Sequence, residues 1–537
     1  MTINVGPGIS ISGGVLITSF PPPPPEFTMT AVVSNNQTIT LPINGVGLNA
    51  NINWGDGNTS SNVTANNPTK TYTTAGNYTI QVTGNVPAFG NSSGFNWLTS
   101  ITNWGNVGLS NLFSGCRSTN ITIVPNNIPS TVTTLSDCFY GASQFNDSNI
   151  ITWNTSNVTN MNNLFFSASN FNQNIANWNT GNVNNMSYMF YNADSFNQNI
   201  ANWNTGNVGN MFAMFSSAND FNQNIANWNT SNVTNMNFMF SGATSFNQNI
   251  ANWNTSNVIS MVNMFGSTIF NQDIGNWDTG NVSNMRTMFQ NATNFNQNIG
   301  NWNTGNVSNM QSMFSGATSF DQNIGNWNTS NVTTMFEMFR NASNFNGNIG
   351  NWNTGNVSNM QSMFQNATNF NQNIGNWNTG NVSNMRTMFS SATNFNQNIG
   401  NWNTSNVTNM SEMFINTTNF NGNIGNWNTG NVSNMQSMFQ SSSNFNGNIG
   451  NWNTSNVTNM YGMFTSATSF NQNIGNWKTG NVANMGYMFN NASAFNANLA
   501  NWCVTNITTK PTNFDTGATS WTGGTATRPQ WGTCPNP

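Results

Sequence analysis

The 25 residues from Asn351 to Gly375, NWNTGNVSNMQSMFQNATNFNQNIG, carry the pattern that decides the fold. Eight of them are asparagine, eight are apolar and none is charged. The Trp recurs from Trp153 to Trp502 at 14 intervals, all of 25 residues except one of 24. A fixed period of this length indicates stacked coils, each too small to bury its apolar side chains alone.

The shortened unit helps to distinguish stacked coils from one continuous helix. It reads GSTIF at 266–270, where a typical unit reads SGATSF. A coil can lose one loop residue locally, whereas a continuous helix would rotate its whole apolar face. Val357, Met360 and Phe364 do follow a helical spacing, but Asn, Thr, Gly and Ser crowd the unit and disfavour helix interiors. We expect a short helical turn around NMQSMF and a short strand around FNQNI.

The composition excludes several classes of partner. Among 537 residues only 4% are charged, none is His, and the formal net charge is −4. Hydrophobic residues make up 36%, including 40 Phe and 20 Trp, so we expect an aromatic core and a surface of amides and hydroxyls. No basic stretch indicates nucleic-acid binding, and no apolar run approaches the roughly 18 residues that span a membrane. We expect neither a nucleic-acid partner nor membrane insertion.

The first repeats resemble a known family. The run from Cys116 to Ala142, CRSTNITIVPNNIPSTVTTLSDCFYGA, resembles a BspA-like leucine-rich repeat. Later units resemble its Asn-rich relative, a bacterial surface-protein repeat with the pattern MF…A…FN…I…W.TSNV…M, over about residues 100–510. The resemblance implies a mostly β chain with short helical turns, arranged as a leucine-rich-repeat-like solenoid of 25-residue coils.

The pattern divides the chain into five segments. We expect a Gly/Ile-rich leader and polyproline linker at 1–26, followed by a small β-sandwich at 27–86. Degenerate capping repeats at 87–152, the Asn-rich solenoid at 153–502 and a C-terminal cap at 503–537 complete the chain.

Two of the N-terminal segments carry resemblances of their own. The pieces WGDG (54–57) and TYTTAGNYTIQVTG (71–84) resemble a PKD-type immunoglobulin-like sandwich, with Lys70 where that family usually has His. The leader resembles the opening of some marine-phage structural proteins. It holds no Lys or Arg in its first 25 residues, so we expect no classical secretory signal.

Two asparagine positions do not vary within the chain. Asn precedes the repeat Val in every unit from Asn157 to Asn481, and it precedes every repeat Trp from Trp178 to Trp502. Stacked Asn side chains can hydrogen-bond from coil to coil and satisfy backbone groups that a turn leaves open. We favour this structural interpretation; a binding role for the amides is the alternative.

The four cysteines are candidates for disulfides. The C-terminal segment resembles the closing segment that often follows such repeats, and Cys503 with Cys534 would staple it. Cys116 and Cys138 occupy repeat positions four apart on one predicted helical face, so in adjacent coils their thiols could meet. Two capping disulfides imply an oxidising compartment. Four buried free thiols are the alternative.

The residues for ordinary enzyme chemistry are missing. Without His there is no ordinary catalytic triad, and the cysteines lack CxxC spacing. The 12 carboxylates are scattered, whereas a glycosidase pair must face one cleft at about 5–10 Å. We therefore expect no catalytic residue, no metal site, no cofactor and no enzymatic activity.

The remaining candidate is a surface. The two positions after the first repeat Met vary most, and stacking would align them in one contact ridge that carries Tyr188, Phe212, Phe238, Phe336, Tyr461 and Tyr487. Aromatic rings beside amides suit glycan or protein recognition. Neutral variation is the alternative, and the opposite, Asn- and Gln-rich strand face is the rival contact surface.

These observations predict a non-enzymatic recognition or structural protein. We expect a virion-attached fibre, appendage or decoration protein of a tailed phage that contacts a host-surface glycan or protein through the solenoid. The N-terminal region would bind other virion or surface proteins. The alternative is a bacterial cell-surface adhesin exported without a classical signal peptide. In both cases the location is extracellular or on the virion surface.

Overall fold

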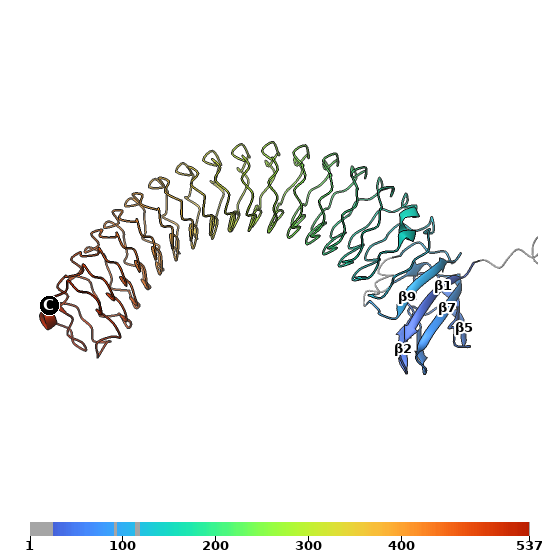
Figure 1. The fold of residues 1–537 in the computed structure, drawn as a ribbon, viewed down its shortest axis with the longest axis horizontal. Coiled ribbons are helices and arrows are strands. Elements are labelled where there is room, and N and C mark those ends of the chain that lie inside the picture. Colours follow the sequence, from blue (N-terminus) through green and yellow to red (C-terminus); the bar gives the residue numbers. More distant parts are fainter. Residues whose placement is uncertain (1–24, 91–93, 113–118, 536–537) are drawn as a thin grey trace, which may run out of the picture.

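The computed structural model describes residues 25–90, 94–112 and 119–535. A small β unit stands at one end, and a long arc of stacked coils runs from it to the C-terminus (Figure 1). Nine strands are described: β1 Phe27–Val33, β2 Gln37–Thr40, β3 Ile43–Asn44, β4 Asn49–Asn53, β5 Thr59–Val63, β6 Thr69–Tyr72, β7 Gly76–Asn85, β8 Ala88–Phe89 and β9 Leu98–Trp104.

The described residues contain almost no helix. Two short 3₁₀ segments occur, η1 Ser148–Thr152 and η2 Gly524–Thr527, and no α-helix is found in the described ranges. Within the same ranges, no helix has the length and apolar character to cross a bilayer. The chain is therefore a mostly β repeat solenoid.

The N-terminal unit is built around a five-stranded sheet in the order β5-β4-β7-β1-β9. Two small antiparallel pairs, β2 with β6 and β3 with β8, accompany it. Alternate residues of β1 are buried, among them Phe27, Met29 and Ala31, because successive side chains of a strand point to opposite faces. The strands β8 and β9 lie beyond residue 86, so part of the expected capping segment completes this unit.

The edge strand β9 joins the sheet to the solenoid. It pairs with β1 on one side, and a parallel bridge links its Ser100 to Ile123 of the first coils. The indole N–H of Trp104 donates to the Asn127 carbonyl at 2.6 Å, and its ring lies 6.3 Å from that of Trp153. The core therefore continues without a break from the β unit into the coils.

The predicted helical turn and strand are both wrong. Ser362 and Asn366 have φ of 56° and 59°, which interrupts any helix in NMQSMF and its continuation. The backbone N–H of Met363 bonds within its own coil to Met360, whereas that of Phe364 bonds to Met388 of the next coil. The segment is thus a series of turns whose backbone N–H groups bond alternately within their own coil and to the next coil.

The only strand-like pairing of each regular coil precedes this turn segment. One parallel bridge per coil links the residue before the first Met to its equivalent in the next coil, as Asn359 pairs with Asn384. In FNQNI the N–H of Asn371 bonds to a side chain, the Asn346 carboxamide, instead of a backbone carbonyl. Without backbone pairing no strand forms there.

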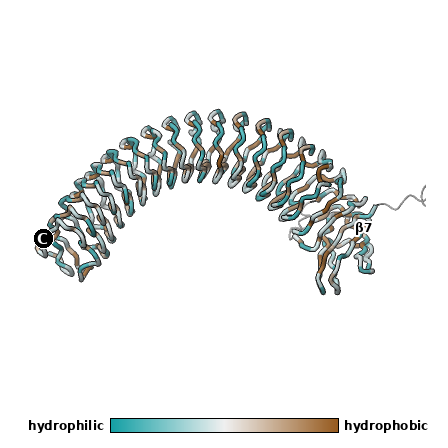
Figure 2. Tube along the Cα trace, viewed as in Figure 1, coloured by the Kyte–Doolittle hydropathy of each residue, from teal (hydrophilic) through white to brown (hydrophobic). Residues whose placement is uncertain are grey.

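Apolar side chains fill each coil in register with the next. The residues equivalent to Val357, Met360, Phe364, Phe370 and Ile374 are fully buried in every regular coil. In Figure 2 the apolar segments recur at the same place in successive coils. The repeat tryptophans stack in one column: where the rings of adjacent coils are in contact, they are nearly parallel and 6.2–6.5 Å apart, for example 2° and 6.5 Å for Trp352 and Trp377.

The spacing of equivalent rings explains the curvature of the arc. From one coil to the next, the ring centroid moves 5.6 Å for Phe364 to Phe389 but 6.3 Å for Trp377 to Trp402. The backbone-bonded turn segment holds adjacent coils closer still, near the roughly 4.8 Å of paired strands. The coils therefore fan out toward the Trp column, which lies on the convex side.

Candidate functional site

Side-chain hydrogen bonds replace backbone bonds on the convex side. The Trp377 indole N–H donates to the Ile349 carbonyl at 3.1 Å, and the Asn381 carboxamide donates to the carbonyl of residue 355 at 2.6 Å, both in the preceding coil. The Thr379 hydroxyl donates to the following coil at 2.9 Å. Longer side-chain groups are needed here because the coils lie more than 6 Å apart. The invariant Asn before Val is therefore structural.

Other asparagines close local turns. The Asn373 carboxamide oxygen accepts the N–H of Gly375 at 3.0 Å, and that of Asn378 accepts the N–H of Gly380 at 3.1 Å. Such turns are a property of Asn, whose short side chain mimics the backbone. The Asn-rich composition is thus largely a hydrogen-bonding requirement of the coil.

The invariant Asn before each Trp behaves differently from these asparagines. All copies from Asn177 to Asn501 are exposed. Among the described residues, none of their side chains makes a hydrogen bond, whereas the structural interpretation predicted bonds between coils. The chain therefore keeps these asparagines identical without using them to hold the fold.

The predicted contact ridge is divided into three parts. Tyr188 and Phe212 lie 4.9 Å apart, and Phe238 follows Phe212 at 5.5 Å. Tyr461 and Tyr487 form a separate pair at 5.5 Å. Phe336 contacts no other ring in the described part of the chain. The stacking of coils aligns these positions, but aromatic side chains occupy too few consecutive coils to make one ridge.

Three further rings extend the first part into what we call the aromatic strip. Tyr140 stacks on Phe166 at 4.3 Å, and Phe166 stacks on Tyr191 at 4.5 Å. Tyr191 meets Tyr188 edge-on at 5.8 Å, and burial, with Tyr191 nearby, raises the pKa of Tyr188. The sequence signal is an aromatic residue directly after the repeat Phe, a position outside the two that the prediction considered.

The orientation of these rings limits what the strip can bind. Rings stacked along the solenoid at 3° and 11° cover one another's faces and present their edges to solvent. Stacking on a sugar requires an open ring face. The tilted rings of Tyr188, Phe212 and Phe238, at 50° and 48° to one another, do not cover one another's faces in this way.

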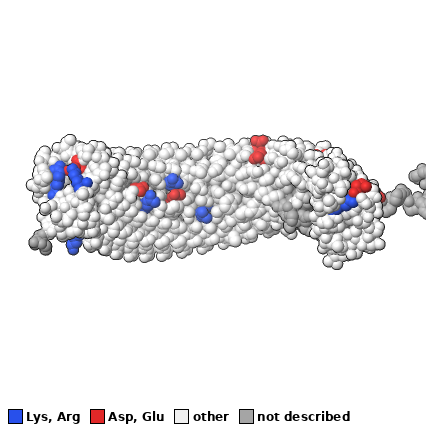
Figure 3. Space-filling model, turned by 90° about the horizontal axis from the view of Figure 1, so that it is seen from below, with Lys and Arg blue, Asp and Glu red and all other residues white. Residues whose placement is uncertain are grey.

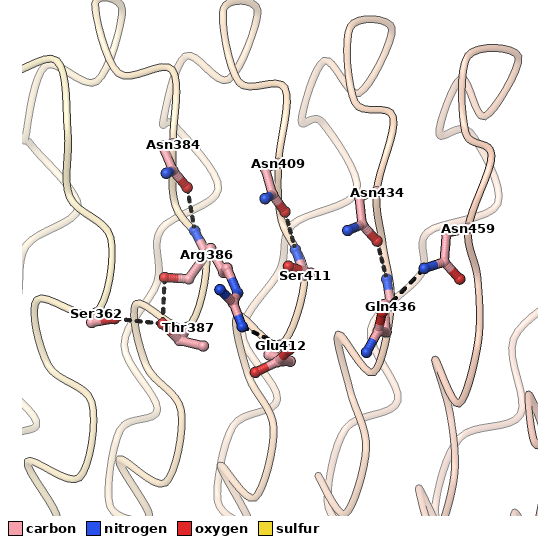
Figure 4. Close-up of polar contacts among 10 residues, drawn as sticks. All are labelled: Ser362, Asn384, Arg386, Thr387, Asn409, Ser411, Glu412, Asn434, Gln436 and Asn459. Atoms are coloured by element: carbon pink, nitrogen blue, oxygen red, sulfur yellow. Dashed lines mark hydrogen bonds and ion pairs between the residues drawn. The ribbon is translucent and has the colours of Figure 1, made fainter.

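The concave side carries few charges. Seen from that side, the molecule is largely uncharged, with isolated acidic and basic groups (Figure 3). Two of the arginines are paired with glutamates: Arg386 with Glu412 at 3.3 Å, and Arg340 with Glu337 at 3.6 Å. Figure 4 shows Arg386 reaching Glu412 of the next coil. These pairs leave little net field to attract a charged partner.

A row of asparagines runs beside these charges. The carboxamide oxygens of Asn384, Asn409 and Asn434 each accept the backbone N–H two residues further on, at 2.9–3.0 Å (Figure 4). Ser260 and Thr334 occupy the same position in other coils. This position therefore also serves turn geometry.

The repeats match a family defined by sequence. The family is described as "Mycoplasma protein of unknown function, DUF285", and overlapping matches cover residues 107–228, 195–277, 213–325, 267–357, 344–440 and 408–522. The chain belongs to the DUF285 family. The DUF285 matches tile the solenoid and extend into the C-terminal cap. A search of curated proteins found no match.

The cysteines of this DUF285 chain follow the prediction at one end. Cys503 and Cys534 form a disulfide that closes the C-terminal cap. At the other end Cys138 is a free, fully buried thiol, which corrects the predicted bond from it to Cys116; Cys116 itself lies outside the described residues. The position of Cys138 and the one four residues later both face the core, as Cys138 and Ala142 show, although the segment is a series of turns and not a helix.

The carboxylates form no multidentate cluster in the described ranges of the DUF285 chain. No group of three or more His, Cys, Asp or Glu residues that could hold a metal ion occurs there. One pair lies in adjacent coils, because the N–H of Asp220 donates to the Asp194 carbonyl at 3.0 Å. The Asp194 carboxylate accepts the Asn219 amide at 2.7 Å, and Asp220 is exposed. Asp194 is half-buried, so water reaches both residues.

Proposed function

We propose that this DUF285 protein is a non-enzymatic surface recognition or structural protein, carried on a tailed-phage virion as a fibre, appendage or decoration. The observation that carries the proposal is the continuous core from β9 into the coils, which makes the β unit and the solenoid one stiff body. Such a body projects a long surface away from its point of attachment. Its groups are mostly amides, hydroxyls and aromatic rings, which suit binding, and it lacks His, the most frequent general acid–base residue.

The N-terminal unit would be the attachment point. Its strands, its buried Trp54 and its Lys70–Asp56 ion pair at 2.7 Å support the resemblance to a PKD-type sandwich. In this proposal the unit binds other virion or surface proteins, and the solenoid binds a host-surface glycan or protein. The disulfide at the far end is compatible with an extracellular location.

The second candidate is a bacterial cell-surface adhesin. The family description, which names a Mycoplasma protein, favours a cellular origin. The solenoid would act in the same way in both settings, because its surface does not depend on what anchors the N-terminal unit. Antibodies against the solenoid separate the two: they should label purified virions for the first and intact cells for the second.

Adsorption of the full-length protein to a panel of bacterial surfaces tests the function itself. With 8 basic and 12 acidic residues in 537, long-range electrostatic attraction contributes little. Binding should change little between about 50 and 500 mM salt, a range in which the Debye length shortens roughly threefold. Adsorption that disappears with salt, or no adsorption to any surface of the panel, would contradict the proposal.

A further inference from the structure

The exposed Asn that precedes every repeat Trp has no structural task that explains its constancy. It recurs in 14 units without change, while exposed neighbours vary: the position two residues later holds Asp278 and Lys478 in two of the units. That variable position closes a turn in most coils, as Asp278 does with the N–H of Gly280 at 2.9 Å. The chain therefore varies at the position of Asp278, whose side chain is hydrogen-bonded, and does not vary at the Asn before Trp, whose side chain makes no hydrogen bond.

Turn geometry does not require this Asn. The N–H of Trp377 donates to the Ile374 carbonyl at 3.2 Å, so Asn376 is the third residue of a β-turn. Its φ is not in the left-handed region, where Asn is favoured over other residues. A turn of this kind accepts most residue types. Repetition of the same exposed carboxamide in every coil therefore points to a ligand.

The spacing of this row, which we call the Asn376 column, selects the class of ligand. Buried Trp rings next to the column are displaced by 6.2–6.5 Å from coil to coil. Each Asn directly precedes one of these tryptophans, so the displacement of the column follows that of the rings. An extended polypeptide repeats every two residues, at about 6.6–6.8 Å. The column and an extended chain therefore stay in register over several coils.

The chemistry of the side chain fits the same ligand. A carboxamide offers an N–H donor and a C=O acceptor, which complement the backbone C=O and N–H of one residue in an extended chain. These two groups of a residue point to the same side of the chain, and those of every second residue point in the same direction. Each Asn of the column can thus bind one residue of the ligand through two hydrogen bonds, without regard to the ligand's side chains.

We propose that the Asn376 column binds an extended polypeptide through its backbone, one dipeptide per coil. This inference rests on the proposed recognition function and names the class of partner: an unpaired strand or extended segment of a host-surface protein. The single bonds are weak, and affinity comes from their repetition along a rigid row. The concave side, with its tighter coil spacing and its turn-bound asparagines, does not offer this match.

The test uses the full-length protein and an uncharged, end-capped peptide of about twelve alternating Ser and Val residues, long enough to span roughly six coils. Fluorescence anisotropy should show binding that survives shuffling of the Ser and Val order. The same peptide methylated on every backbone nitrogen, so that neither edge offers an N–H, should bind at least about tenfold more weakly, because each Asn carboxamide oxygen loses its donor. Soluble dextran should not compete; competition by dextran would mean that the column binds a polysaccharide, and would overturn the proposal.

The matched variants change five residues each. Replacing Asn326, Asn351, Asn376, Asn401 and Asn426 with Ala should weaken peptide binding by about tenfold or more. The control replaces Ser308, Thr333, Ser358, Ser383 and Thr408 with Ala, which the chain itself carries at the equivalent Ala483. Both variants should keep the far-UV circular dichroism of the parent. Equal peptide binding by both would overturn the proposal.

Adsorption to bacterial surfaces, measured on the same variants, separates this inference from the proposed function. If the parent and the Asn variant adsorb equally, the recognition function stands and the column is not its site. If the parent does not adsorb but binds the peptide through the column, the inference stands and the recognition function on bacterial surfaces fails.

Discussion

At the scale of single residues, side-chain hydrogen bonds hold the coils together where adjacent backbones are too far apart to bond directly. The Trp352 indole, only 3% exposed, donates to the Ile324 carbonyl at 3.0 Å. The same bond recurs in every regular coil, with Trp and Ile 28 residues apart, or 27 across the shortened unit. The same carbonyl accepts a backbone N–H of its own coil, as Ile324 does from Trp327 at 3.2 Å, so the indole is a second donor that comes from the next coil. The repeat Trp therefore both fills the core and links adjacent coils through its indole N–H.

Replacing Trp352 with Phe should lower stability by about 1 kcal/mol, because the Ile324 carbonyl loses its donor from the next coil and keeps only the backbone N–H of Trp327. Hydrogen exchange of the amides in the adjoining coils measures this local opening. The neighbouring Asn351→Ala is the control and should stay within about 0.5 kcal/mol of the parent. Equal protection factors in the two variants would contradict the assigned role of the indole.

Asp515 should make the C-terminal cap sensitive to acid. Burial raises the pKa of Asp515, but hydrogen bonds and charges from Arg528 and Lys510 outweigh burial and hold the pKa below 3.8. A pKa lowered by folding means that the ionised form stabilises the cap above about pH 3.8, and that this stability is lost as the pH falls through the folded value.

Hydrogen exchange in residues 503–535, followed from about pH 5 to pH 2, should therefore show the cap opening before the central coils. Asp515→Asn should remove this acid step and weaken the cap at neutral pH. A cap that opens at the same pH in the parent and the variant would show that another group controls it.

At the scale of elements, the ends of the solenoid are closed by different means. The N-terminal coils stack on the sheet edge at β9, so the β unit covers them. At the other end Trp521 packs edge-on against Phe495 at 4.9 Å and covers the last aromatic column. The disulfide Cys503–Cys534 then ties the cap to the last coil. Solenoids need such caps because a terminal coil otherwise exposes its core.

The cysteines should react as one disulfide and one buried thiol among the described residues. Reduction of the intact protein should add the mass of two hydrogen atoms, and iodoacetamide should label Cys138 only after denaturation without reductant. Cys503→Ser with Cys534→Ser should lower the stability of the cap by about 2–4 kcal/mol. A gain of four hydrogens on reduction, or no Cys138 thiol after denaturation, would show that Cys138 is bonded.

At the scale of the whole molecule, the arc arises because backbone groups make the bonds between coils on one side and longer side-chain groups make them on the other. Backbone bonds at the turn segment draw the coils together, and the long Trp, Thr and Asn side chains on the other side let them spread. The spread then repeats in the same direction in every coil, so small differences add up to the arc in Figure 1. The convex surface is the one on which the Asn376 column lies.

Removal of one complete unit, residues 351–375, should leave a folded and shorter arc. The new junction joins Gly350 to Asn376, which restores the repeat sequence and all inter-coil bonds. Small-angle X-ray scattering should show a reduced maximum dimension, with circular dichroism per residue unchanged. Removal of residues 351–362 alone is the control and should unfold the adjacent coils, because it breaks every column. Equal folding of both variants would contradict the coil assignment.

The sequence by itself determined the stacked coils, the aromatic columns and the disulfide at the C-terminal end. These features follow from residue identity at a fixed period, which stacking places in register. Only the tertiary structure decided how each coil is built, because the N–H of Phe364 bonds to a residue 24 positions away while that of Met363 bonds within its own turn. Local propensity cannot distinguish these two partners, so a helical turn, a strand and a continuous contact ridge were predicted where turns and a divided ridge occur. The same long-range bonds decided which of the invariant asparagines hold the fold and which are free to bind a partner.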